Sequence, residues 1–295
     1  MAGWRRRPVL GVAAGALLLA GCTSGSGDDT GASPRKGSAS PGSPTGSASP
    51  SPRPSASAAA SSEPYTLAED RAPKTRAEAV AFVRGLAVRP DYFGAGYRRR
   101  EPYESDPAQW AVLGEDCLWR REALPDTALA SLTRAFELPE QGGKGPVYVS
   151  LTVTVHENTV AARRDMAGAL ESALRCPEQR LNATDVVSGL YSRVDAAADG
   201  RNPVTEDDLT ESGEWIADGA SKAYPFDWYK FRLGPVTVAA TARHGAGRSK
   251  QEEDTVTGEV FQGVSLVATD IDRWGERGGD AGGTDEPTAT KGADR

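Results

Sequence analysis

The chain has 295 residues and a formal net charge of −7 at pH 7. An acidic chain lacks the basic surface on which nucleic-acid binding depends, so we expect no nucleic-acid partner. Two compositionally simple ends leave about 200 residues for folding, which suits one domain of moderate size.

The N-terminus has the organisation of a bacterial export signal. Arg5-Arg6-Arg7 precedes an apolar stretch, Pro8 to Ala20, that is too short to span a bilayer as a permanent helix. The sequence Leu19-Ala20-Gly21-Cys22 at its end resembles the bacterial lipobox. This resemblance implies diacylglycerol on the Cys22 sulfur, cleavage between Gly21 and Cys22, and a mature chain that begins at Cys22.

A lipidated Cys22 makes the membrane the first expected partner. Two acyl chains hold a protein firmly at a bilayer, whereas one chain gives only marginal binding. We therefore expect a lipid-anchored protein at the extracytoplasmic face of the cell membrane, with the lipid as its sole anchor. The export route stays open, because Arg6-Arg7-Pro8-Val9-Leu10 fits a twin-arginine pattern and a basic start is equally normal for general secretion.

Composition divides the rest of the chain. Residues 23–62 are almost all Ser, Ala, Gly, Pro and Thr, and such a segment cannot bury enough apolar surface to offset its ordering entropy. We expect a signal peptide over 1–21, a lipidated and disordered tether over 22–63, a folded domain over 64–274 and a disordered tail over 275–295. The tether would lift the domain away from the membrane.

The folded part begins with a helix and continues with strands. Thr75 and Glu78 form a capping box ahead of an apolar helical face, and Pro90 ends the run. Leu132–Leu138 is expected to be a strand. The clearest strand is Val147–His156, in which apolar residues alternate with mostly polar ones. One side of this strand should meet a core, and the other side is polar.

A helix, a hairpin and an ambiguous segment follow. Asn158 caps a helix whose apolar stripe reaches Leu174, and residues 228–232 and 236–243 form a hairpin around Leu233-Gly234-Pro235. From Val256 to Trp274 apolar residues recur at helical spacing, yet glycines and β-branched residues weaken the helix prediction. Helices mixed irregularly with hairpins indicate an α+β fold, a single domain with helices packed on one face of an antiparallel sheet.

Cys117 and Cys176 remain as an even pair once Cys22 is lipidated. In an oxidising exterior such a pair predicts a disulfide, which would contribute about 4 kcal/mol to stability in the chain-entropy model. The alternatives are two buried free thiols or a catalytic thiol with a histidine partner. Because the chain has two histidines, the catalytic alternative is disfavoured.

The order of tether, mixed domain, strand, helix and cysteine resembles that of actinobacterial surface lipoproteins. It also resembles the extracytoplasmic sensor domains of actinobacterial Ser/Thr kinases, in which a strand leads into an alanine-containing helix and a disulfide cysteine. The matching segments are Val147–Val155, the helix that ends at Leu174, and Cys176. Since the sequence shows no kinase domain or transmembrane helix, the resemblance implies at most a sensor-like module.

Catalytic signatures are absent from the sequence. It contains no Gly-x-Ser-x-Gly elbow, no zinc-binding His-Glu-x-x-His helix and no phosphate-binding glycine loop. We expect His156 and His244 to be surface or strand-end residues. The prediction is therefore a non-enzymatic binding or sensor-like module without a cofactor. The alternative is a cell-wall-acting hydrolase that uses carboxylates the sequence does not identify.

One acidic loop has part of the spacing of a calcium site. Asp195, Asp199, Gly200 and Glu206 stand at positions 1, 5, 6 and 12 of an EF-hand-like loop, but Ala197 occupies a ligand position. The alternative is a polar loop followed by an acidic helix start, Thr205-Glu206-Asp207-Asp208, whose carboxylates favour the helix dipole. We favour the second interpretation and predict no metal site.

The aromatic run Tyr224–Phe231 is the candidate ligand site. On a strand, Phe226 and Trp228 share one face, whereas Tyr229 lies on the other. Exposed Trp and Tyr side chains can stack on sugars or anchor a protein partner. We therefore assign binding of an unidentified envelope ligand or partner to Tyr224, Phe226, Trp228 and Tyr229. The alternative is that these aromatics belong to the core.

Overall fold

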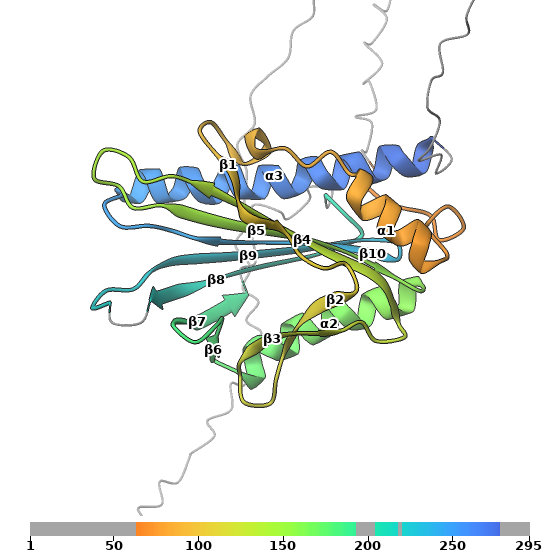
Figure 1. Cartoon of the computed structure of the whole chain (residues 1–295), viewed down its shortest axis with the longest axis horizontal. Coiled ribbons are helices and arrows are strands. Elements are labelled where there is room, and N and C mark those ends of the chain that lie inside the picture. Colours follow the sequence, from red (N-terminus) through yellow and green to blue (C-terminus); the bar gives the residue numbers. More distant parts are fainter. Residues whose placement is uncertain (1–62, 193–203, 218–219, 278–295) are drawn as a thin grey trace, which may run out of the picture. The chain divides into compact units, whose positions relative to one another are not determined.

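An antiparallel sheet of eight strands, in the order β1-β4-β5-β10-β9-β8-β7-β6, organises the folded domain (Figure 1). The computed structural model describes residues 63–192, 204–217 and 220–277. The strands of this sheet are β1 (Arg98–Glu104), β4 (Ala128–Leu138), β5 (Val147–His156), β6 (Glu178–Arg180), β7 (Asp185–Ser192), β8 (Asp207–Ala217), β9 (Tyr224–Leu233) and β10 (Val236–Arg243). A separate hairpin consists of β2 (Gln109–Leu113) and β3 (Trp119–Ala123).

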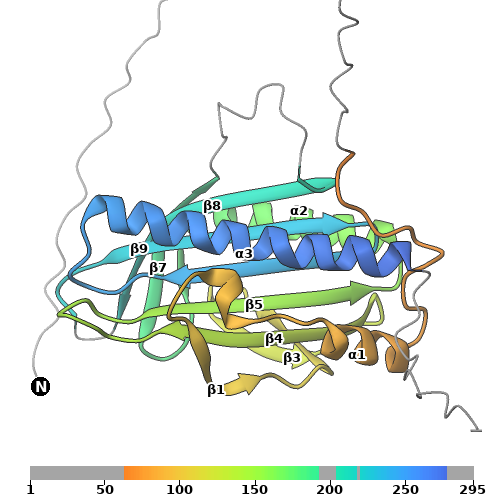
Figure 2. The same ribbon diagram turned by 90° about the horizontal axis from the view of Figure 1, so that it is seen from above.

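Helices lie on both faces of the sheet. The helices are α1 (Arg76–Gly85), the short 3-10 helix η1 (Pro90–Phe93), α2 (Thr159–Arg175) and α3 (Lys250–Glu276). Figures 1 and 2 show α1 and α3 on one face and α2, with the β2–β3 hairpin, on the other. The α+β class and the antiparallel sheet are confirmed. The expectation that helices cover one face alone is wrong, because α2 packs on the polar side of the strands. We call the two sides the α3 face and the α2 face.

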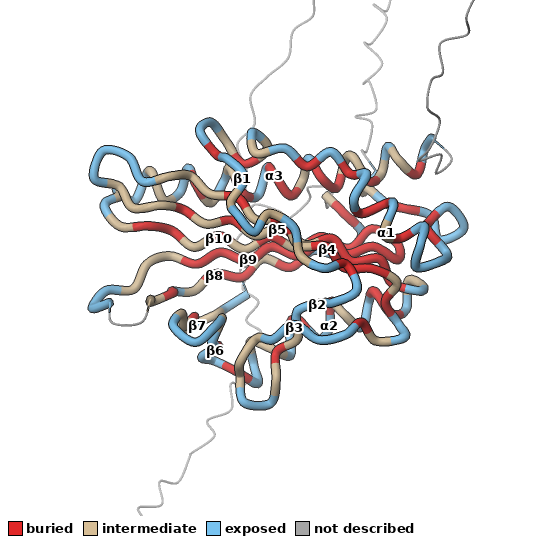
Figure 3. The backbone as a smooth tube through the Cα atoms, in the orientation of Figure 1, coloured by how far each residue is buried: buried red, intermediate tan, exposed pale blue. Residues whose placement is uncertain are grey.

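The α3 face holds the main apolar core. The residues of β5 that alternate from Val147 to Val155 are all at most 1% exposed, and they belong to one core cluster with Phe231, Val238 and residues of α3. Figure 3 shows buried backbone concentrated in the central strands. Gly263 lets α3 approach η1 closely, since a Cβ there would lie 2.5 Å from the Phe93 ring. A long helix thus seals this face of the sheet against water.

The local signals of the sequence are largely confirmed. Thr75 caps α1 with a complete capping box, and Asn158 accepts a hydrogen bond from the Ala161 backbone amide at the start of α2. Strand β5 has the expected bounds, and β9 and β10 form the expected hairpin. Gly234 in its turn has φ +53°, and a Cβ at this position would clash with the Leu67 carbonyl.

The ambiguous C-terminal segment is one helix of 27 residues, α3. A capping box of Ser249 and Glu252 begins it, and buried packing outweighs the low helix propensity of its glycines and β-branched residues. The helix continues to Glu276, past the expected domain boundary at 274. No helix within the described residues is long and apolar enough to cross a membrane.

The expected helix start at Thr205–Asp208 is wrong, because Asp207 begins strand β8. Glu206 and Asp207 each pair with Arg232 on the neighbouring strand β9, and Glu206 also accepts a hydrogen bond from the Gly234 amide. These carboxylates therefore balance a buried guanidinium rather than a helix dipole.

Candidate functional site

A cavity of about 620 Å³ lies on the α2 face. The strands β4, β5, β9 and β10 form its floor, α2 forms one wall, and the β2–β3 hairpin forms another. We call it the α2 cavity. It exists because α2 and the hairpin cover only part of the polar side of the sheet.

Hydroxyl groups cover the floor of the α2 cavity. The same alternation that buries one side of β5 turns its polar residues to this side. Ser131 and Thr154 share a hydrogen bond of 2.8 Å, as do Thr133 and Thr152. The floor hydroxyls are Ser131, Thr133, Ser150, Thr152, Thr154, Thr237 and Thr241. Ser131, Thr154 and Thr237 are buried and hydrogen-bonded within the protein, so Thr133, Ser150, Thr152 and Thr241 are the floor hydroxyls with access to a ligand.

Tryptophan side chains form the apolar part of the lining. Trp228 reaches in from β9, and Trp110 and Trp119 come from the hairpin. The rings of Trp119 and Trp228 meet edge to face with centroids 6.1 Å apart. The Trp119 indole N–H donates to Gln179 Oε1 at 2.8 Å, which fixes the ring. Fixed aromatic faces beside adaptable hydroxyls are typical of ligand sites.

A charged cluster stands where α2 meets the sheet. Lys230 Nζ donates to Asp165 Oδ1 at 2.7 Å and to the Asp165 carbonyl at 3.1 Å. The Thr237 hydroxyl donates to Asp165 Oδ2 at 2.9 Å, and His156 Nε2 lies 3.1 Å from Thr237 Oγ1. Because the Thr237 proton goes to Asp165, its oxygen accepts from His156, which places a proton on His156 Nε2. The cluster therefore joins α2 to β5, β9 and β10.

The same cluster fixes the protonation of Asp165. Burial by itself would raise the pKa of this carboxyl, but the charge of Lys230 and hydrogen bonds from His156 and Lys230 hold it well below its usual value. Asp165 is therefore a carboxylate at neutral pH. It acts as an anchor for Lys230 rather than as a proton donor.

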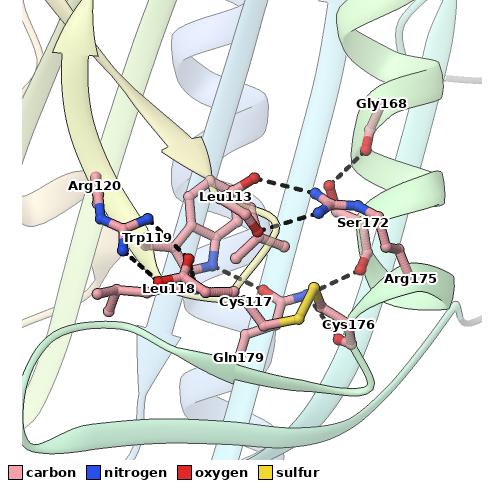
Figure 4. The surroundings of a disulfide bond; sticks show 12 residues. Leu113, Cys117, Leu118, Trp119, Arg120, Gly168, Ser172, Arg175, Cys176 and Gln179 are labelled. Atoms are coloured by element: carbon pink, nitrogen blue, oxygen red, sulfur yellow. Dashed lines mark hydrogen bonds and ion pairs between the residues drawn. A yellow bond between two sulfur atoms is a disulfide. The ribbon is translucent and has the colours of Figure 1, made fainter.

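The hairpin wall is attached covalently to the end of α2 (Figure 4). Cys117, between β2 and β3, forms the expected disulfide with Cys176, with Cα atoms 5.6 Å apart. The Arg175 guanidinium donates to the Leu113 and Gly114 carbonyls at 3.1 Å each, and the Arg180 amide donates to the Cys117 carbonyl at 2.8 Å. The disulfide and these hydrogen bonds together hold the wall against α2.

The structure divides the aromatic run between two sides. Phe226 and Trp228 are largely buried in a small apolar cluster whose edge lines the α2 cavity, and Tyr224 lines a second hollow beside it. Tyr229 is 2% exposed on the α3 face, where its hydroxyl donates to the Thr257 carbonyl at 3.1 Å. Since strand alternation turns Tyr229 into the core, it has no access to the α2 cavity.

Other residues singled out in the sequence lie outside the described part of the chain. These are the lipobox with Cys22, the tether, and Asp195, Asp199 and Gly200 of the acidic loop. Glu206 of that loop is described and pairs with Arg232. Across the described ranges, no group of three or more His, Cys, Asp or Glu side chains is placed to hold a metal ion.

Both histidines stand at strand ends, which is one of the two expected positions, but neither is a surface residue. His156 is 2% exposed in the charged cluster, and His244 is fully buried with its Nε2 2.9 Å from Asp227 Oδ2. Each imidazole has its Nε2 next to a carboxylate, which offsets part of the cost of burial, whereas Nδ1 of His244 is buried without a hydrogen-bond partner. The sequence gives no sign of this, because both aspartates are distant along the chain.

The hairpin contributes residues that sequence reasoning missed. Trp110, Trp119 and Arg121 line the α2 cavity, although no strand was expected between Gln109 and Ala123. The sequence does contain a signal for this hairpin, because short apolar runs at 110–113 and 118–119 flank the polar turn sequence Gly114-Glu115-Asp116. The runs are short and half polar, so their pattern alone is weak.

Two solved structures are weakly similar to this chain. The extracellular domain of PknH from Mycobacterium tuberculosis is 12% identical, with a TM-score of 0.37, over 69% of this chain and 98% of its own. An uncharacterised protein from Mycobacterium smegmatis is 11% identical, with a TM-score of 0.33, over 70% of this chain and 100% of its own. No family model and no curated protein matches the chain. At TM-scores this low, the similarities establish neither a common fold nor a common function.

Proposed function

We propose that this protein is an extracytoplasmic, lipid-anchored binding module that takes a ligand into the α2 cavity without catalysis. The observation that carries the proposal is the cavity itself, about 620 Å³ in volume. Ligand sites commonly have volumes of about 300–1,000 Å³ and combine apolar walls with a few placed polar groups. The floor hydroxyls and Trp228 supply both kinds of contact.

The disulfide and the lipobox support the location. Disulfides persist in oxidising exteriors, and Cys117–Cys176 closes one in this domain. The lipobox at Leu19–Cys22 supplies the membrane anchor of the proposal. Replacement of Cys22 by alanine should release the protein from the membrane fraction, and a Cys22→Ala protein that stays firmly bound would overturn the anchor.

Binding is favoured over hydrolysis by the state of the cavity carboxylates. The α2 cavity is lined by two carboxylates of the described chain, Asp165 and Glu171. A glycosidase needs one carboxyl group that keeps its proton near neutral pH. Asp165 has a lowered pKa and is held by Lys230 as an anion. It is therefore unsuited to act as the general acid.

The proposal is tested by filling the cavity. Ala239 lies in the floor, between Lys230 and Thr152 on the neighbouring strands. Ala239→Phe adds volume there without removing a hydroxyl. The full chain with Cys22→Ser is incubated with a delipidated envelope extract, and ligands that remain bound are identified by mass spectrometry. We expect a bound small molecule on the parent chain and its loss from Ala239→Phe.

The outcome distinguishes binding from hydrolysis. Recovery of the same molecules from both proteins, or from neither, would contradict a ligand site in the α2 cavity. Turnover of envelope polysaccharide that disappears in Glu171→Gln would instead support the hydrolase. The matched control is Glu253→Gln on α3, which removes an equal charge from the other side of the sheet.

A further inference from the structure

A second hollow, of about 470 Å³, adjoins the α2 cavity on the same side of the sheet. Arg243 stands at its centre, with its guanidinium 5.2 Å from the Tyr148 ring centroid and 5.4 Å from that of Trp215. Arg100 lies over the same Tyr148 ring at 4.6 Å. Arg243 also pairs with Asp185. We call this the Arg243 hollow.

The two hollows follow one another along the strands. On β5, His156, Thr154, Thr152 and Ser150 line the α2 cavity, and the next residue on that face, Tyr148, lines the Arg243 hollow. On β10 the same step leads from Thr241 to Arg243. Because His156 and Thr154 are buried, the accessible track runs from Thr152 to Pro146 and is about 20 Å long at about 3.3 Å per residue. Such a length suits an extended ligand better than a compact one.

Both hollows are positively charged in an acidic protein. The α2 cavity is lined by four basic residues and two acidic ones, and the Arg243 hollow by two basic residues and one acidic one. The whole chain has a net charge of −7. Basic side chains gathered along one track of an acidic surface favour an anionic ligand over a neutral or cationic one.

Several of these cations are not neutralised by the protein. Among the described residues, Arg121, Arg164 and Arg100 form no salt bridge. Partial burial lowers the pKa of the Arg121 guanidinium, with Asp106 as the opposing charge nearby. Arg121 and Arg164 are exposed and Arg100 is half-buried, so their guanidinium groups can reach a carboxylate or phosphate of a ligand.

We propose that the two hollows form one track for an acidic oligosaccharide. This inference rests on the proposed function and names its ligand class. Hydroxyls along the floor match the donors and acceptors of sugar hydroxyls, tryptophan rings match the apolar faces of sugar rings, and Arg121 and Arg100 meet acidic substituents at two separated points. A lipid tail would bring no anionic group to Arg121 and Arg100 along its length, whereas an acidic oligosaccharide brings one to each.

The test compares two oligosaccharides that differ in charge. The first is a peptide-free hexasaccharide from peptidoglycan, in which alternate sugars carry a lactyl carboxylate. The second is the hexamer of N-acetylglucosamine, which has the same backbone without charge. Binding to the full chain with Cys22→Ser is measured by calorimetry and tryptophan fluorescence. We expect the acidic sugar to bind at least tenfold more tightly, with an advantage that falls as salt rises.

Two arginine variants test the length of the track. Arg121→Gln in the α2 cavity should weaken both the acidic hexasaccharide and the acidic disaccharide about tenfold, the effect of one charge-assisted hydrogen bond. Arg100→Gln in the Arg243 hollow should weaken the hexasaccharide alone, because the disaccharide is too short to reach it. Arg163→Gln and Arg76→Gln are the matched controls, since both arginines are exposed, form no salt bridge among the described residues and line neither hollow.

Each possible result contradicts a different part of the proposal: the ligand charge, the length of the track or the ligand class. Equal binding of the neutral and acidic hexamers would overturn the anionic class. Loss of binding in Arg121→Gln but not in Arg100→Gln would overturn the extended track and leave the α2 cavity as the site. If neither sugar binds while the Ala239→Phe comparison still identifies a ligand, the oligosaccharide is wrong and the proposed function stands.

Discussion

The two faces of the central sheet come from the same strands yet differ in polarity and in how completely helices cover them. On the α3 face, Val153, Phe231 and Val238 pack under a helix of 27 residues and leave no room for water. On the α2 face, a helix of 17 residues and a hairpin cover hydroxyls and leave a cavity. One face therefore supplies stability, and the other is free to supply a site.

The difference lies in how each face is covered. Buried apolar side chains of α3, from Val256 to Ile271, belong to the core under β9 and β10, and burial of apolar area contributes about 25 cal/mol per Å². On the other side, α2 is held by the Asp165–Lys230 ion pair, by a small apolar cluster and by the disulfide. Substitutions should therefore affect the two faces in different ways.

The largest effect is expected on the α3 face. Phe231 is fully buried, and its ring centroid lies 5.7 Å from that of Phe261. Phe231→Ala should lower the free energy of unfolding by about 3–5 kcal/mol, because it removes transfer energy and leaves a cavity. Urea unfolding followed by circular dichroism measures the loss. A cost below that of the cavity variants would contradict the division between the faces.

The next largest effect concerns the covalent attachment of the hairpin wall. Cys117→Ser combined with Cys176→Ser should lower the free energy of unfolding by about 2–4 kcal/mol, because the unfolded chain gains freedom over 59 residues. Thermal or urea unfolding gives the value. Cys22→Ser, which removes the cysteine outside this pair, should leave the unfolding of the domain unchanged.

A third effect is the pH dependence of the unfolding free energy, to which the Asp165 carboxylate on the α2 face contributes. The pKa of Asp165 is lowered in the folded state, so its contribution is present above the ordinary carboxyl value of 3.8 and is lost as the pH falls below it. We expect unfolding free energy to decline by about 1–2 kcal/mol on acidification through this range. Asp165→Asn should flatten that decline.

Asp227 on the α3 face provides the internal comparison for this slope. Burial would raise its pKa, but hydrogen bonds from His244 and Thr257 lower it, so its contribution has the same sign. Asp165→Asn should therefore remove part of the pH dependence and leave the part due to Asp227. Glu115→Gln, a change at an exposed hairpin residue, is the control. An unaltered slope in Asp165→Asn would show that α2 is held by other contacts.

The smallest effect is expected at the cavity floor. Thr241→Ala should change the free energy of unfolding by less than about 0.5 kcal/mol, because its hydroxyl faces open space in the α2 cavity. The neighbouring residue Ala240 is 1% exposed on the α3 face. Ala240→Thr should cost about 1–3 kcal/mol through overpacking and a buried hydroxyl. Equal costs at 240 and 241 would show that both faces are packed alike.

Sequence reasoning succeeded where the signal is local. The capping box at Thr75, the alternation of Val147–His156 and the turn at Gly234 each depend on neighbours within a few residues, and the structure has all three. The pairing of Cys117 with Cys176 was also expected, because the chain leaves no other pair of cysteines once Cys22 is set aside.

Sequence reasoning failed where the partner is distant. The surroundings of His156 depend on Asp165 and Thr237, and those of His244 on Asp227. The acidic residues at 206 and 207 were assigned to a helix start because Arg232 could not be placed beside them. Tyr229 and Trp228 are adjacent aromatic residues, and alternation along the strand predicts that they face opposite sides of the sheet. It does not say which side is the core and which side lines a cavity.

The sequence alone determined the alternation of β5, the starts of α1 and α2 and the disulfide partners, since each follows from spacing along the chain. Tertiary structure alone decided which face each helix covers, and with it that the polar side of β5 would line a cavity. The physical reason is that alternation sorts side chains into two sets without specifying what packs on either. A cavity arises from incomplete cover, which depends on how far α2 and the hairpin extend over the sheet.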